Sequence, residues 1–93
     1  MSNHYSHRHP ATIAHRAHRA AIGWAMRGDA AIARGDLEGA EIATLAAAIW
    51  ADRARDAAAS PRRRGHAAQR HADLADAVAI GIAERAWAAG AGR

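Results

Sequence analysis

Arginine and histidine are the residue types in this sequence with the clearest capacity to bind a ligand. The chain has 93 residues, and its 13 basic residues are all arginine, against nine acidic residues and seven histidines. Arginine presents a planar, permanently charged fork that suits phosphates and carboxylates. Histidine changes its charge near neutral pH. The formal net charge of +4 therefore favours an anionic partner.

The basic residues gather at one end of the expected helices, together with all seven histidines. Arg62, Arg63 and Arg64 follow the helix start signal Ser60-Pro61. Backbone N–H groups and the helix dipole at such a start also favour a phosphate. We interpret this end as an anion-binding pole for nucleic acid or another polyanion, the alternative being a solvated charged surface. The arginines expected to form it are Arg16, Arg19, Arg55, Arg62, Arg63, Arg64 and Arg70.

A metal site is a weaker interpretation of the histidines. His15 and His18 are three residues apart on one helix, and His4, His7 and His9 precede them. The surrounding arginines oppose a cation, and no strong ligand spacing such as HExxH occurs. We therefore expect neither a metal nor another cofactor, with His15 and His18 as the weak candidates.

Trp50, Arg53 and His71 form another group, because all three fall on the apolar faces of their helices. Counting back from Ser60 places Trp50 and His71 at nearly the same level. A small pocket with an aromatic wall and two polar groups could form there. The alternative is that Arg53 extends out of the bundle end and His71 is a hydrogen-bonded core residue.

Four large apolar residues lie off the main apolar faces, namely Ile22, Met26, Ile80 and Trp87. Isolated apolar residues are ordinary on a protein surface. A contiguous patch, in contrast, is usually buried against a second copy or another protein. We therefore expect a partner or oligomer interface at these four residues.

Catalysis finds little support in the sequence. There is no cysteine nucleophile, the serines and threonines lack the context of a catalytic triad, and no glycine-rich loop follows a strand. The absence of cysteine fits a reducing compartment. No apolar stretch reaches the length of a membrane span, and the N-terminus lacks the apolar core of a signal peptide. We expect a cytoplasmic protein that is not an enzyme and has no membrane partner, and its alanine and arginine usage indicates a high-GC bacterium or its phage.

Helix start and stop signals divide the chain into three helices. Pro10 suits the first turn of a helix, where a missing N–H costs nothing. Gly35 and Asp36 supply a C′ glycine and an N-cap in two residues, which predicts a tight turn. Ser60 and Pro61 repeat the start signal.

The predicted helices span about 10–34, 37–59 and 61–89, and no segment alternates like a strand. Residues 1–9 are expected to be a flexible arm containing His and Arg, and 10–93 a single domain. Connections this short force neighbouring helices to be antiparallel. The sequence therefore predicts an all-α, alanine-rich, up-down-up three-helix bundle that could self-associate.

A spacing of 100° per residue predicts the buried face of each helix. The first helix would bury Ile13, Ala17, Ala20, Ala21, Trp24, Gly28, Ala31 and Ile32. The second would bury Ile42, Leu45, Ala46, Ile49, Trp50 and Arg53. The third would bury Ala67, His71, Leu74, Val78, Gly81 and Ile82.

Small residues around the first turn are also arranged like those of a known helical hairpin. The residues concerned are Gly28-Asp29-Ala30, Gly35-Asp36-Leu37-Glu38, Ala40 and Ala47. About a quarter of the chain thus resembles a single tetratricopeptide-type hairpin, which implies close helix contact and at most a protein-binding role. The sequence departs from that pattern at Thr44 and Asp52, and no second repeat follows. We interpret the resemblance as convergence on close helix packing.

These features predict a small accessory or regulatory protein that binds nucleic acid or another polyanion at the arginine and histidine pole. The alternative is a protein-interaction or homo-oligomeric helical module, an adaptor or an inhibitor, with no role in nucleic-acid binding.

Overall fold

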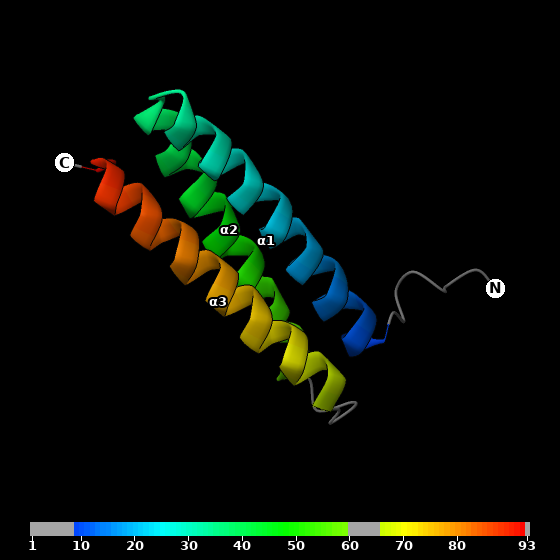
Figure 1. Ribbon diagram of the computed structural model, residues 1–93. Coiled ribbons are helices and arrows are strands. Elements are labelled where there is room, and N and C mark those ends of the chain that lie inside the picture. The colour runs from blue at the N-terminus through cyan, green and yellow to red at the C-terminus, as the bar shows by residue number, and fades with distance from the viewer. Residues whose placement is uncertain (1–8, 60–65, 93) are drawn as a thin grey trace.

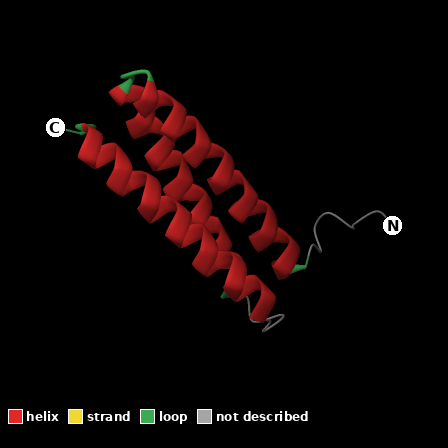
Figure 2. Ribbon diagram, viewed as in Figure 1, coloured by secondary structure: helices red, strands yellow, loops and turns green. Residues whose placement is uncertain are grey.

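Three antiparallel helices form the protein (Figure 1). The computed structural model describes residues 9–59 and 66–92. Helix α1 spans Pro10–Ala33, α2 spans Leu37–Ala58 and α3 spans His66–Ala89, and each helix packs against the other two. No strand occurs in the described residues (Figure 2). The predicted up-down-up three-helix bundle is confirmed, while the predicted arm up to residue 8 and the start signal Ser60-Pro61 lie outside the described residues.

Local capping explains where α1 and α2 begin. The Nδ1 atom of His9 accepts a hydrogen bond from the N–H of Ala11 at 3.1 Å, and Pro10 follows in the first turn. A carboxylate oxygen of Asp36 accepts from the N–H of Gly39 at 2.8 Å. Each cap satisfies a backbone donor that has no partner within its own helix.

The C-terminal ends of α1 and α3 are capped by the same backbone motif. Gly35 and Gly90 have φ values of +77° and +108°, which glycine adopts without steric cost. After each glycine the next backbone N–H reaches back over five residues, from Asp36 to the carbonyl of Ala31 and from Ala91 to that of Ala86, at 2.8 and 2.9 Å. This is the Schellman arrangement, which stops the helix and turns the chain.

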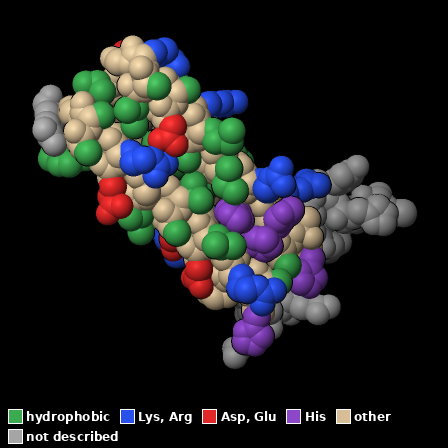
Figure 3. Space-filling model, in the orientation of Figure 1, with side chains coloured by type: hydrophobic (Ala, Val, Ile, Leu, Met, Phe, Trp, Pro, Cys, Tyr) green, Lys and Arg blue, Asp and Glu red, His purple; other side chains and the backbone are tan. Residues whose placement is uncertain are grey.

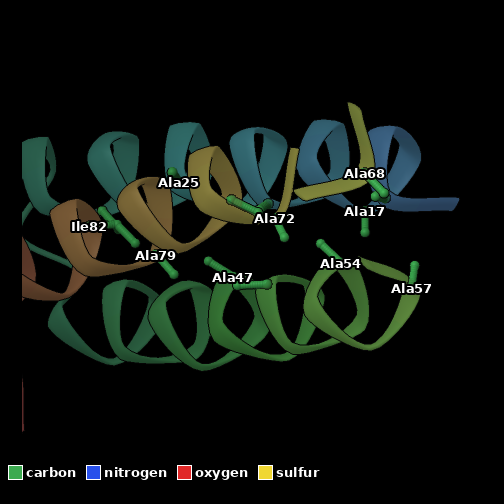
Figure 4. Packing of buried hydrophobic residues seen from close by; sticks show 13 residues of the cluster. Ala17, Ala25, Ala47, Ala54, Ala57, Ala68, Ala72, Ala79 and Ile82 are labelled. Atoms are coloured by element: carbon green, nitrogen blue, oxygen red, sulfur yellow. The ribbon is translucent and has the colours of Figure 1, made fainter. Parts of the chain in front are cut away.

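The core of the bundle is built almost entirely of alanine. Buried residues recur every three or four positions along each helix, and Ile82 is the single large side chain that is fully buried among the described residues. In Figure 4 the methyl groups of Ala17, Ala54 and Ala72 point into the space between the helices. Small facing side chains allow helix axes to approach closely.

The predicted buried faces of α2 and α3 are displaced by one residue position, although Ile82 of α3 is buried as predicted. Instead of the predicted residues, α2 buries Ala40, Ala43, Ala47, Ala51, Ala54 and Ala57. Helix α3 buries Ala68, Ala72, Ala75, Ala79, Ile82 and Ala86. One position corresponds to a rotation of about 100°. The prediction followed the large aliphatic side chains, but an adjacent stripe of alanine allows closer packing and occupies the core.

Helix α1 follows the prediction in part. Ala17, Ala21, Gly28 and Ala31 are buried as expected. Ile13, in contrast, is 40% exposed, because the buried position beside it is Ala14.

Gly28 marks the closest approach of the three helices. A Cβ atom on Gly28 would lie 2.8 Å from Cδ1 of Ile82 on α3 and 3.1 Å from Cβ of Ala43 on α2. The close helix contact implied by the tetratricopeptide resemblance is therefore present at this glycine. Gly23, the preceding glycine on α1, lies in open space instead, since a Cβ atom there would meet no atom within 4 Å.

Gly28→Ala and Gly23→Ala form a matched pair that tests this packing. We expect Gly28→Ala to lower the free energy of unfolding by about 1–3 kcal/mol, because the added methyl group overpacks the core. Gly23→Ala should raise it by about 0.5–1 kcal/mol, because alanine has the higher helix propensity and the site is open. Urea denaturation at a fixed protein concentration measures both. Equal stabilisation by the two substitutions would contradict the close approach at Gly28.

Candidate functional site

Large apolar side chains lie on the outside of the bundle rather than in its core. Among the described residues, the exposed large apolar side chains are those of Ile13, Met26, Leu37, Ile42, Leu45, Ile49, Leu74, Ile80 and Trp87. The surfaces between the helices differ in chemistry: histidines meet between α1 and α3, and grooves lie between α1 and α2 and between α2 and α3. We describe them in turn.

Three histidines meet between α1 and α3. The Nδ1 atoms of His18 and His71 are 3.3 Å apart, and the ring centroids of His15 and His71 are 4.8 Å apart. His15 and His18 come together because residues three apart lie on one side of a helix. Figure 3 shows histidine side chains gathered on this face, in the half of the molecule where α1 and α3 begin. We call His15, His18 and His71 the histidine cluster.

Two members of the histidine cluster, His18 and His71, have pKa values lowered in the folded protein. Burial is the main cause that lowers the pKa of His18, followed by the positive charges of His71 and His15. Burial likewise lowers the pKa of His71, with a further contribution from His15. The arginines on both helices act in the same direction, Arg19 on His18 and Arg70 on His71.

The histidine cluster is not arranged as a metal centre. Among the described residues, no three side chains of His, Asp or Glu are placed to hold a metal ion together. His15 and His18, the weak metal candidates of the sequence, instead contact His71. This contact also separates His71 from the other members of the predicted pocket.

Trp50 and Arg53 line the groove between α1 and α2. The guanidinium carbon of Arg53 lies 4.4 Å from the centroid of the Trp50 ring. Ile13 and Arg16 of α1 complete this part of the groove. The structure thus brings Trp50 and Arg53 together as expected but places His71 in the histidine cluster.

The groove between α2 and α3 is largely apolar with an ion-paired end. Its sides include Ala48 of α2 and Ile80 and Ala83 of α3. At one end Arg55 forms ion pairs with Asp52 on its own helix and Asp76 on α3. The charge of Arg55, an expected anion-binding residue, is therefore already balanced by two carboxylates.

The expected anion-binding pole divides between these surfaces. Arg16 lies in the α1–α2 groove, Arg19 and Arg70 stand beside the histidine cluster, and Arg55 is ion-paired at the α2–α3 groove. Arg62, Arg63 and Arg64 lie outside the described residues. The structure therefore does not join the described arginines into one site.

The four expected interface residues also divide between surfaces. Ile80 lines the α2–α3 groove, and Trp87 lies two helical turns further along α3. Ile22 and Met26 share a stripe of α1 with Asp29, which is paired to Arg85 of α3 (N–O distance 2.8 Å). The two pairs thus border different surfaces.

Sequence reasoning missed the contribution of Trp24 and Arg27 to the α1–α2 groove. The guanidinium carbon of Arg27 lies 4.5 Å from the centroid of the Trp24 ring, which repeats the pairing of Arg53 with Trp50. The available signal was the spacing Trp-x-x-Arg, which occurs at 24–27 and again at 50–53. Residues three apart on a helix are neighbours, so both pairs could have been anticipated.

The histidine cluster should make folding stability depend on pH. An unfolded histidine titrates near 6.5, and the pKa values of His18 and His71 are lower in the folded state. The unfolded chain therefore takes up protons first as the pH falls, so stability is complete above about 6.5 and decreases below it. We expect a lower midpoint of thermal unfolding at pH 5.5 than at pH 8.

His71→Gln should reduce this pH dependence, because it removes one histidine with a lowered pKa and the positive charge that lowers the pKa of His18. His66→Gln, at an exposed position on the same helix and outside the cluster, is the control and should keep the wild-type dependence. Thermal unfolding followed by circular dichroism at constant ionic strength measures all three proteins. The same pH response in wild type and His71→Gln would refute the assignment.

Known proteins add no further constraint on these surfaces. Comparison of the chain with protein-family models, curated proteins and solved structures found no match. None of the described helices is long and apolar enough to cross a membrane. The functional argument therefore rests on the chemistry of the three surfaces.

Proposed function

We propose that this chain is a non-enzymatic helical interaction module whose first partner is a second copy of itself. One observation carries the proposal: the bundle buries alanine and leaves most of its large aliphatic side chains exposed. Burying a Leu or Ile side chain stabilises by about 1.5–3 kcal/mol, whereas a single methyl-sized group contributes about 0.8 kcal/mol. An isolated bundle leaves much of this stabilisation unused, and a partner surface would supply it.

The α2–α3 groove is the surface best suited to a second copy. Ile80, which lines the groove, and Trp87, also on α3, are each 59% exposed, and Leu45, which follows the groove residue Thr44 on the outer side of α2, is 61% exposed. The charged groups at the groove, Asp52, Arg55 and Asp76, are paired with each other.

A twofold dimer would place Ile80 of each copy against the groove of the other, since an isologous interface uses the same patch twice. The small side chains of the groove leave room for a larger one. Because Asp52, Arg55 and Asp76 are paired with one another, association would leave no buried charge without a partner.

The second candidate function is binding of an anionic partner, and nucleic acid is the preferred one. The observation that favours it is the arginine and histidine content of the α1–α2 groove and of the histidine cluster between α1 and α3. Arg19 and Arg70 stand beside the histidine cluster, and Arg16 and Arg53 stand beside Trp50. Arginine in such settings contacts phosphates, and the affinity would fall as salt rises.

Substituting the α2–α3 groove tests the self-association proposal. Sedimentation velocity should show a dimer for the wild type and a monomer for the double variant Leu45→Glu/Ile80→Glu, because two carboxylates would be buried in each copy. Both residues are exposed, so circular dichroism should show an unchanged helix content.

Met26→Glu is the matched control, because Met26 is 66% exposed but lies on α1, away from the α2–α3 groove. It should leave the dimer intact. A wild-type chain that stays monomeric at its highest soluble concentration would overturn the proposal. Dissociation by Met26→Glu alone would move the interface to α1.

A further inference from the structure

The α1–α2 groove consists of three adjoining hollows that follow one another along the two helices. It begins at Ile13, Arg16 and Arg53, passes Gly23 and the two tryptophans, and ends at Arg34 and Ile42. Neighbouring parts share residues, since Trp50 belongs to the first two and Trp24 to the last two. At 1.5 Å per residue the stretch of α1 from Ile13 to Arg34 measures about 32 Å.

This groove is basic, in contrast to the α2–α3 groove. None of its described lining residues is acidic, and four of them are arginines, namely Arg16, Arg27, Arg34 and Arg53. Arg34 is paired with Asp36 at the α1–α2 turn. The other three form no ion pair within the described residues, so their charge is available to an anion.

Each tryptophan of the groove holds an arginine beside it. The guanidinium groups of Arg27 and Arg53 lie over the rings of Trp24 and Trp50 at 4.5 and 4.4 Å. Such cation–π contacts keep the charge in place at the groove before any ligand binds. Both rings are only half-buried, and Ala20 and Gly23 leave space next to them.

A basic groove with aromatic side chains along it is the combination that binds single-stranded nucleic acid. Arginines follow the phosphates, and unpaired bases stack on aromatic rings. Helix axes packed through small side chains lie about 8–10 Å apart. Unpaired bases of a single strand can reach the tryptophan rings, whereas the bases of a duplex are already paired and stacked inside the double helix.

We propose that the α1–α2 groove binds a single strand of nucleic acid, with Arg16, Arg27 and Arg53 contacting phosphates and Trp24 and Trp50 contacting bases. This inference rests on the second candidate function, an anionic partner, and assigns its site and class. A dimer formed through the α2–α3 groove would leave the α1–α2 groove open. Both binding functions could therefore operate in one assembly.

Two double variants with equal loss of charge test the assignment. Arg27→Gln/Arg53→Gln removes both stacked guanidinium groups, and Arg19→Gln/Arg70→Gln removes the two arginines beside the histidine cluster. The probe is a fluorescently labelled thymidine strand of about 12 nucleotides, within the usual range of site sizes. Anisotropy at salt concentrations of about 50 and 200 mM gives the affinity and its salt dependence.

The groove variant should lose affinity roughly tenfold at the lower salt concentration and show a shallower salt dependence. The cluster variant, whose two arginines lie outside the groove, should lose less affinity than the groove variant and keep a steeper salt dependence. In a Trp87→Phe background, where only Trp24 and Trp50 emit, binding should quench the fluorescence because bases stack on the rings. A duplex of the same length and a polyglutamate chain should bind more weakly.

Several outcomes would overturn the inference, and they are distinguishable. Loss of affinity only in the cluster variant would keep the anionic partner but move its site to the histidine cluster. Equal binding of duplex or polyglutamate would reject the assignment to a single strand. Absence of binding by any of the polyanions would remove both the inference and the second candidate function.

Discussion

The three helices can approach one another only as closely as their facing side chains allow, and in this bundle those side chains are mainly methyl groups. Alanine recurs every three or four residues on each helix, and Gly28 lies where Ile82 of α3 and Ala43 of α2 meet. A large residue at any of these positions would force the axes apart. The rest of the structure depends on this close packing, because it leaves little room in the core for the large side chains.

The displaced side chains give each surface its own character. Tryptophan and arginine line the α1–α2 groove, histidine rings meet between α1 and α3, and aliphatic residues dominate the α2–α3 groove. A thin bundle with an alanine core therefore presents a large amount of chemically distinct surface for its size. This division means that the proposed self-association surface and the proposed anion-binding groove do not overlap.

The arginines also differ between these surfaces, because some are ion-paired and others are not. Arg85 is held to Asp29 across α1 and α3, and Arg55 to Asp52 and Asp76 across α2 and α3. In the α1–α2 groove the arginines instead rest on tryptophan rings. A guanidinium stacked on a ring keeps its full charge, whereas one paired with a carboxylate does not attract a further anion. The position of the carboxylates thus selects which arginines are available to a partner.

The amino-acid sequence predicts the three helices, their antiparallel order and the ends marked by His9, Asp36, Gly35 and Gly90, because these residues act through local hydrogen bonds that need no other helix. It did not determine which face of α2 and α3 is buried. Each of these helices carries an aliphatic stripe and an alanine stripe about 100° apart, and periodicity favours the aliphatic one. Only the tertiary structure decides between them, since the benefit of alanine comes from the closeness of all three helices at once. The same packing decides that His71 meets His15 and His18 rather than Trp50.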